Sequence, residues 1–234
     1  MTKQTAPIEF YYSSSPNGRK ITIMLEELGV PFTVHYLHFS RKDQFKPEFL
    51  KLNPNHKVPV ITDPEGPGGE PVTVFESGAV LKYLGEKFGR FYPTDWRQRI
   101  DTDVWLIWSV ASFGPFIGQL HHFYHDAPEQ LAYPIKRYED EMHRLYGILS
   151  GRLEDREWIA GGMYTIADIS TFGWVHRHPR HKLDLATYPV VKRWYDTILE
   201  RPAVVKALAM PTPPKIDDDP VADAAAQIMR FNQG

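Results

Sequence analysis

The chain has 234 residues, of which 42% are hydrophobic and 24% charged, and its 27 Lys plus Arg against 29 Asp plus Glu give a formal charge of -2. The apolar share is sufficient for a buried core, and the balanced charge argues against a nucleic-acid partner, because such binding rests on clustered basic residues. There is no cysteine, so the chain can form no disulfide, thiolate metal site or cysteine nucleophile. Any thiol chemistry must therefore be supplied by a ligand.

Two stretches bear on cellular location and membranes. The first ten residues lack the long apolar segment of a secretory signal, which favours a cytoplasmic location. Residues 104–120 carry no formal charge, but they contain Gly114-Pro115 and are at the short limit for crossing a bilayer. We therefore expect this stretch to be a buried core helix, and we expect no membrane partner.

The first ninety residues alternate between strand and helix signals, and Gly29 is placed to cap the first long helix. In chain order, the pattern predicts a strand at 8–12, a turn at 13–18, a helix at 21–28, a strand at 32–38, a short helix at 47–52, strands at 58–61 and 72–75, and a helix at 76–87. This βαβ-α-ββα order predicts a small mixed sheet covered by helices, which is the thioredoxin-like layout.

Beyond residue 93 the pattern becomes wholly helical. Apolar residues from Ile135 to Leu153 recur at helical spacing, with charges at the intervening positions. Thr165 and Asp168 have the spacing of a capping box, and a further helix follows Pro189. We therefore predict an α/β thioredoxin-like domain at 1–89, an all-α domain at 93–210, and a C-terminal tail at 211–234 whose role the sequence leaves open.

Three short segments are candidates for a binding site. Val58-Pro59 is a candidate cis-proline beside a strand edge that can pair with an extended peptide. Ser77 stands at a helix start, where the dipole favours a carboxylate, and the adjacent Glu76 could hold an ammonium. The pair would suit a zwitterionic amino-acid head group, while a simple helix cap is the alternative explanation of Ser77.

The third segment, Ser15-Pro16-Asn17-Gly18, follows the first strand. A turn with an N-cap is one explanation, since Pro-Asn-Gly favours turns. In the other explanation, the Ser15 hydroxyl, the Asn17 amide and the helix N-terminus converge on an anion and lower the pKa of a bound thiol.

The ten histidines raise the question of a metal site. His121 and His125 could share a helix face, and His176, His178 and His181 form a second cluster. Because neither an HExxH pattern nor an adjacent acidic ligand accompanies them, we expect polar lining and no metal. A serine hydrolase is disfavoured as well, since no GxSxG elbow is present.

Together these motifs resemble those of the glutathione transferase superfamily: Val-Pro and Glu-Ser-Gly in a thioredoxin-like domain, followed by Thr-Ile-Ala-Asp in a helical one. Ser-Pro-Asn-Gly-Arg-Lys-Ile, Asn-Pro-Asn and His-Phe-Tyr-His are similar to segments of the nu class, the bacterial disulfide-bond oxidoreductases, and of related fungal nitrogen-regulator-like glutathione transferases. The resemblance covers about residues 8–210.

The resemblance implies a cytoplasmic homodimer that uses one or two molecules of glutathione, or glutathione disulfide, and no metal. It implies that Ser15 and Asn17 lie near the glutathione sulfur, with Ser15 standing where the nu class usually has a threonine. The other implied contacts are Gln44 and Lys57 with the glycyl end or backbone of glutathione, Val58 with the cysteinyl main chain, Glu76 and Ser77 with the γ-glutamyl head, and Arg137 with the neighbouring subunit's site.

We therefore expect a glutathione transferase-like disulfide reductase in which a bound glutathione thiolate attacks a small-molecule disulfide. Conjugation to electrophiles or peroxide reduction would use the same sulfur. A non-catalytic glutathione-binding regulatory module is the alternative from another class. Tyr11 and Tyr12, expected in or at the end of the first strand, compete with Ser15 and Asn17 for the role of activating donor.

Overall fold

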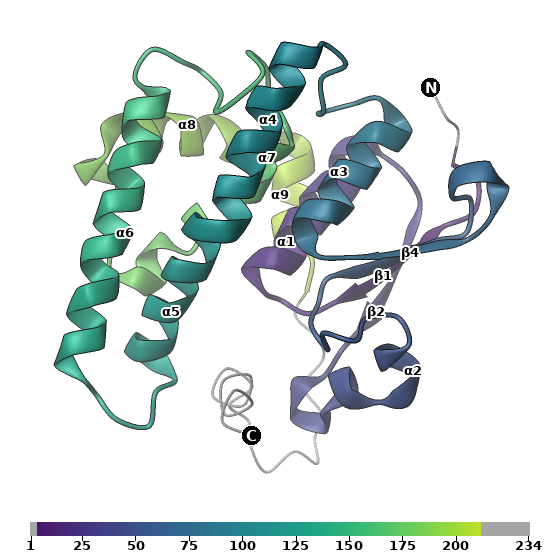
Figure 1. Ribbon diagram of the computed structural model, residues 1–234, viewed down its shortest axis with the longest axis horizontal. Coiled ribbons are helices and arrows are strands. Elements are labelled where there is room, and N and C mark those ends of the chain that lie inside the picture. The colour runs from purple at the N-terminus through teal and green to yellow at the C-terminus, as the bar shows by residue number, and fades with distance from the viewer. Residues whose placement is uncertain (1–3, 212–234) are drawn as a thin grey trace.

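A computed structural model of the chain describes residues 4–211, in which an α/β part and a helical part lie side by side (Figure 1). The α/β part consists of β1 (Ile8–Tyr12), α1 (Pro16–Leu28), β2 (Phe32–Tyr36), α2 (Pro47–Leu50), β3 (Val60–Asp63), β4 (Val72–Phe75) and α3 (Ser77–Phe88). Their order is the predicted βαβ-α-ββα, so the expectation of a thioredoxin-like fold is confirmed.

The sheet has the strand order β2-β1-β3-β4. β1 is parallel to β2 and antiparallel to β3, and β3 is antiparallel to β4. Val60 pairs with Phe75. This register places the residues just ahead of β3 beside the start of α3, where two of the predicted site segments meet.

The alternation of side chains along β1 separates two clusters. Ile8, Phe10 and Tyr12 are buried in the main core with α1 and α3, whereas Tyr11 packs on a smaller cluster that contains Phe49 of α2. The sheet therefore has α1 and α3 on one face and α2 on the other.

The helical part consists of α4 (Trp96–Trp108), α5 (Gly114–His125), α6 (Ala132–Leu153), α7 (Ile166–Val175), α8 (Pro189–Leu199) and α9 (Pro202–Leu208). A turn of π-helix at Ser109–Phe113 joins α4 to α5. The predicted capping box of Thr165 and Asp168 is confirmed at the start of α7, and the Asp168 carboxylate also accepts a hydrogen bond from the Trp194 indole at 2.9 Å. The apolar stripe of α6 is buried at Met142, Leu145, Tyr146, Leu149 and Leu153.

Several element bounds differ from the prediction, and three of the differences have a plain physical reason. α1 begins at Pro16 instead of residue 21, because proline supplies the backbone angle of a first helical residue and needs no N–H partner there. β2 ends at Tyr36, and the His38 N–H donates to the Asp43 carboxylate at 2.8 Å instead of extending the strand. β3 begins after Pro59, which has no N–H to offer to the sheet.

The prediction of a buried core helix at 104–120 is wrong for the first part of that stretch. The stretch is helical, but Val104 and Ile107 are 56% and 61% exposed, because α4 turns only Thr102 and Leu106 fully inward. Within residues 4–211 no helix is long and apolar enough to span a membrane. Of the predicted tail at 211–234, residues 212–234 lie outside the described part of the chain.

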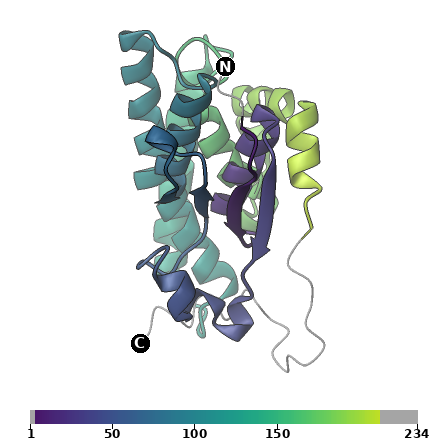
Figure 2. The same cartoon turned by 90° about the vertical axis from the view of Figure 1, so that its right-hand side faces the viewer.

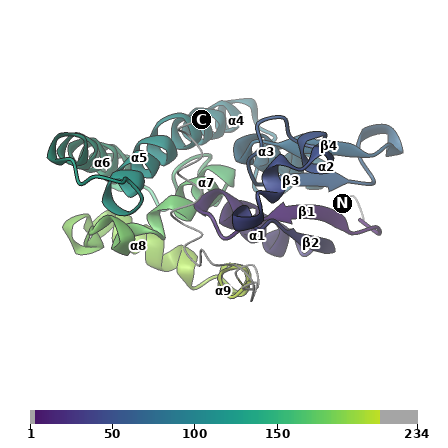
Figure 3. The same ribbon diagram turned by 90° about the horizontal axis from the view of Figure 1, so that it is seen from below.

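The α/β and helical parts share one continuous core. α1 lies between the sheet and α7 (Figure 3), and α9, drawn in yellow, lies beside α1 (Figure 2). Gly173 of α7 faces the first turn of α1: a Cβ at this position would be 2.8 Å from the Pro16 carbonyl oxygen and 3.0 Å from Cγ of Lys20. The missing side chain therefore allows the backbones of the two helices to come together.

Gly173→Ala should lower the free energy of unfolding by about 1–3 kcal/mol, because the added methyl group would overlap main-chain atoms. Gly147→Ala is the matched control. Gly147 also lies in a helix, but a Cβ there would meet nothing within 4 Å, so alanine should be neutral or stabilise by up to about 1 kcal/mol. Urea unfolding followed by circular dichroism measures both changes, and the same change in both variants would contradict the tight α1–α7 contact.

Candidate functional site

Ser15 caps the N-terminus of α1. Its Oγ accepts a hydrogen bond from the Gly18 N–H at 3.0 Å, so the N-cap explanation of this serine is correct. A hydroxyl that accepts one hydrogen bond still has its own proton to donate. The helix end, with its free N–H groups and positive dipole, favours a negative group at this place.

Asn17, in the first turn of α1, is held by the helical part. The indole N–H of Trp174 donates to Oδ1 of Asn17 at 3.3 Å, which leaves the amide NH2 for another partner. Trp174 in turn lies close on α5, since a Cβ at Gly114 would be 2.6 Å from the indole nitrogen. Trp174 cannot be recognised as a site residue from the sequence, because a tryptophan in an apolar helix has the same pattern as a core residue.

A second group of predicted residues meets where β4 enters α3. Glu76 has φ 65° and ψ 116°, a conformation that non-glycine residues rarely adopt outside functional sites, and its carboxylate accepts from the Asn55 amide at 3.3 Å. Ser77 is buried at the first position of α3. The pairing of β3 with β4 brings Val58-Pro59 beside it, and that peptide bond is cis, as predicted.

Lys20 connects the two groups and was missed by the sequence analysis. Its side chain extends from α1 and is 1% exposed, with Nζ 3.4 Å from Oγ of Ser77. Burial lowers the pKa of Lys20 to about 7, while Glu76 acts in the opposite direction. A carboxylate at the start of α3 would favour the charged ammonium. The available signal was a lysine on the same helix face as the buried Ile23 and Met24.

The competing tyrosines lie in β1, as expected. Tyr12 is fully buried in the main core, and the ring of Tyr11 stacks on His35 with 4.8 Å between ring centres. Burial raises the pKa of both hydroxyls. Ser15 and Asn17, which lie at the α1 N-terminus itself, stay the predicted sulfur donors.

The remaining predicted residues are Gln44, Lys57 and Arg137. Gln44 is buried in the short 3-10 helix Asp43–Phe45, and its Oε1 has no hydrogen-bond partner among the described residues. Lys57 is exposed just ahead of Val58. Arg137 is exposed on α6, which lies on the far side of the helical part from the sheet (Figures 1 and 3).

Comparison with known proteins identifies the family. Residues 14–87 match the glutathione S-transferase N-terminal domain, and residues 113–202 match the glutathione S-transferase C-terminal domain. The chain belongs to the glutathione transferase family. Its resemblance to that family, stated above from short motifs, is confirmed.

Relatives of this glutathione transferase include members of both predicted groups. Disulfide-bond oxidoreductase YfcG of Escherichia coli is 46% identical over 202 residues, covering 86% of this chain and 94% of the relative. Transcriptional regulator URE2 of Saccharomyces cerevisiae is 28% identical, covering 88% of this chain and 69% of the relative. A glutathione transferase from Pseudomonas putida, solved with one glutathione disulfide bound per subunit, is 39% identical with a TM-score of 0.84, covering 90% of this chain and 94% of that one.

The two histidine clusters of this glutathione transferase meet in space. The ring of His121 lies 4.7 Å from that of His125 and 5.5 Å from that of His181, measured between ring centres. Burial lowers the pKa of His121 to about 4 and that of His181 to about 3, and the neighbouring histidines add to the effect. In residues 4–211 no three metal-ligating side chains are arranged to hold an ion.

Acid should therefore weaken the fold through His181, which is buried without its proton. Its pKa of about 3 lies below the value of 6.5 for the free side chain, so below about pH 6.5 the unfolded state binds the proton and the folded state does not. Going from pH 7 to pH 5 should lower the free energy of unfolding by about 2 kcal/mol through this group. His181→Leu should remove that loss of stability, and the control His143→Gln, at an exposed position, should keep it. Urea unfolding at pH 7 and pH 5 measures the loss in each variant. Equal pH dependence in both variants would contradict the assignment to His181.

Proposed function

We propose that this glutathione transferase reduces small-molecule disulfides with glutathione. The bound glutathione thiolate attacks one sulfur of the disulfide, the S–S bond breaks, and the other sulfur leaves as a thiolate that takes up a proton. A second glutathione thiolate attacks the mixed disulfide, which releases the remaining thiol and glutathione disulfide. Conjugation to electrophiles and peroxide reduction would use the same sulfur, and a cytoplasmic location stays a prediction from the sequence.

The observation that carries the proposal is the polar N-terminus of α1 in a chain without cysteine. A thiol must come from the ligand, and the Ser15 hydroxyl and the Asn17 NH2 group are available to donate to it beside a helix dipole that favours a thiolate. Trp174 supports this role by fixing which end of the Asn17 amide is free. The similarity to a disulfide-bond oxidoreductase favours the same reaction.

The rest of the glutathione molecule would be held along the edge from α3 to β3. Ser77, with the buried ammonium of Lys20 behind it, suits the γ-glutamyl carboxylate, and the exposed Glu76 suits the adjacent ammonium. The main chain ahead of β3 would pair with the cysteinyl unit. The residues assigned to that main chain and to the glycyl end are Val58, Gln44 and Lys57.

Turnover of bis(2-hydroxyethyl) disulfide with glutathione tests the proposal. Asn17→Ala should slow turnover and raise the pKa of the bound thiol, because a charge-assisted hydrogen bond worth about 1–3 kcal/mol is lost. Trp174→Phe should shift the same pKa in the same direction by less, since the amide keeps its place but loses its orientation. With glutathione saturating, the pH dependence of kcat/KM for the disulfide reports this shift for each variant, because the glutathione complex is then the enzyme form that meets the disulfide.

Other outcomes separate the rival assignments. Ser15→Ala should be milder than Asn17→Ala, because water can replace a hydroxyl. A large defect confined to Tyr11→Phe or Tyr12→Phe would contradict the assignment of the sulfur donors. Calorimetric binding of glutathione without any turnover would favour a regulatory module, and the absence of both binding and turnover would contradict glutathione dependence.

The enzyme further acts as a homodimer in this proposal, with Arg137 completing the partner's site. An exposed apolar stripe on α4, formed by Trp96, Ile100, Val104 and Ile107 at spacings of four, four and three residues, supports an interface because such a continuous face is rarely left in water. Arg137 is exposed on α6, which lies on the far side of the helical part from the sheet (Figure 1), so the proposal has Arg137 act across such an interface.

Ile107→Glu should convert the dimer to a monomer, because it places a charge within the apolar stripe of α4. Val205→Glu is the matched control, since Val205 is also an exposed apolar residue but lies on α9. Light scattering coupled to size exclusion gives the mass of each variant. A monomeric unsubstituted chain, or a dimer that persists in Ile107→Glu, would refute the α4 interface.

A further inference from the structure

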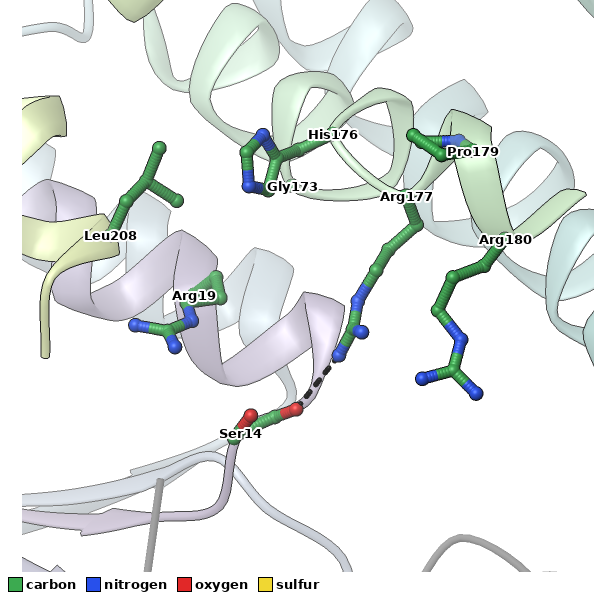
Figure 4. A pocket seen from close by; sticks show the side chains of 8 residues that line it. All are labelled: Ser14, Arg19, Gly173, His176, Arg177, Pro179, Arg180 and Leu208. Atoms are coloured by element: carbon green, nitrogen blue, oxygen red, sulfur yellow. Dashed lines mark hydrogen bonds between the residues drawn. The ribbon is translucent and has the colours of Figure 1, made fainter. Parts of the chain in front are cut away.

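A polar hollow lies beside the loop that connects β1 to α1. It has a volume of about 230 Å³ and is enclosed by α1, the end of α7, the turn that follows it, and α9 (Figure 4). Its lining residues are Ser14, Arg19, Gly173, His176, Arg177, Pro179, Arg180 and Leu208. We call it the arginine pocket, after Arg19, Arg177 and Arg180; no acidic side chain is among its lining residues.

Among residues 4–211, no carboxylate neutralises the positive charge in the arginine pocket. Arg177 donates to the Ser14 carbonyl oxygen at 2.9 Å, and Arg19 donates to the carbonyl oxygens of Ala207 and Met210 at 2.8 and 3.1 Å. These acceptors are uncharged, and within the described residues none of the three arginines forms an ion pair. Arg180 extends beside Arg177 toward the same opening (Figure 4).

The crowding of these cations affects the ionisation of Arg177. Burial lowers the pKa of the Arg177 guanidinium, and repulsion from Arg180 and Arg19 lowers it further. An anion placed among them would relieve this repulsion and could accept the guanidinium N–H groups still available. The planar guanidinium matches a carboxylate in shape, so a carboxylate is a suitable ligand.

The arginine pocket adjoins the proposed reaction centre. Ser14, whose carbonyl accepts from Arg177, directly precedes Ser15, and Gly173 at the pocket wall directly precedes Trp174, which orients Asn17. A disulfide held near the α1 N-terminus would therefore have this group of cations as its neighbour on the side of α7.

We propose that the arginine pocket binds a carboxylate of the disulfide substrate, so that the enzyme favours disulfides that carry carboxylates. This inference rests on the proposed function. The covalent steps are those already given: the glutathione thiolate forms the new S–S bond, and the substrate thiol leaves with a proton. The arginines take no part in electron transfer and act only by holding the acidic end of the substrate.

The test compares two disulfides of similar length, neutral bis(2-hydroxyethyl) disulfide and acidic 3,3′-dithiodipropionate. Arg180→Gln should lower the ratio of kcat/KM for the acidic disulfide to that for the neutral disulfide by about tenfold, and the fall should shrink as salt is added. Arg177→Gln should lower the ratio as well; Arg180→Gln is the decisive variant because its guanidinium does not support the Ser14 carbonyl. Comparing this ratio between variants cancels the different intrinsic reactivities of the two disulfides.

Arg156→Gln is the matched control, since it removes an exposed arginine that pairs with Asp155 and does not line the pocket, and it should leave the ratio unchanged. Inorganic sulfate should also inhibit reduction of the acidic disulfide more strongly than that of the neutral one, and Arg180→Gln should abolish this difference. An unchanged ratio in both pocket variants, with the neutral disulfide still turned over, would overturn the arginine pocket alone. No turnover of either disulfide by the unsubstituted enzyme would overturn the proposed function and this inference together.

Discussion

Gly173 lets the backbone of α7 lie against the first turn of α1, and the contacts that shape the site follow from that approach. The next residue, Trp174, reaches Asn17, and Arg177 one turn later reaches the Ser14 carbonyl. The helical part thus finishes a site whose other residues come from the α/β part. Because the contact joins main-chain atoms, which cannot change rotamer, a small displacement of α7 would disturb the orientation of Asn17.

Paired and unpaired cations have different roles in this protein. Lys87 pairs with the buried Asp63, and Arg201 pairs with Glu27, so these charges are neutralised inside the fold. Lys20 has a serine hydroxyl as its close partner, and the arginines of the pocket have carbonyl oxygens. Burying a cation without a carboxylate is costly, and a bound anion offsets that cost. In the two proposals above, Lys20 and the arginines of the pocket are the cations that an acidic ligand would pair with.

The exposed apolar stripe of α4 shows that apolar composition alone does not predict burial. The uncharged run at 104–120 indicated burial, yet composition does not distinguish a face turned to the core of the same chain from one turned to a partner. The structure separates them, because Leu106 is buried while Val104 and Ile107 are exposed. The proposed homodimer would give these side chains an apolar environment without placing them in the core of one subunit.

Features that depend on residues close together in the chain, or on composition, could be predicted from the amino-acid sequence alone. The order of strands and helices, the Gly29 cap and the Thr165–Asp168 capping box all follow from residues within a few positions of one another. The absence of cysteine is a property of composition alone. Three features become visible only in the folded chain: which end of the Asn17 amide is free, how deeply Lys20 is buried, and that three arginines share one pocket. The bond from Trp174 to Asn17 spans 157 positions and that from Arg177 to Ser14 spans 163, and no local periodicity encodes contacts at such separations, because they exist only after the helices have packed.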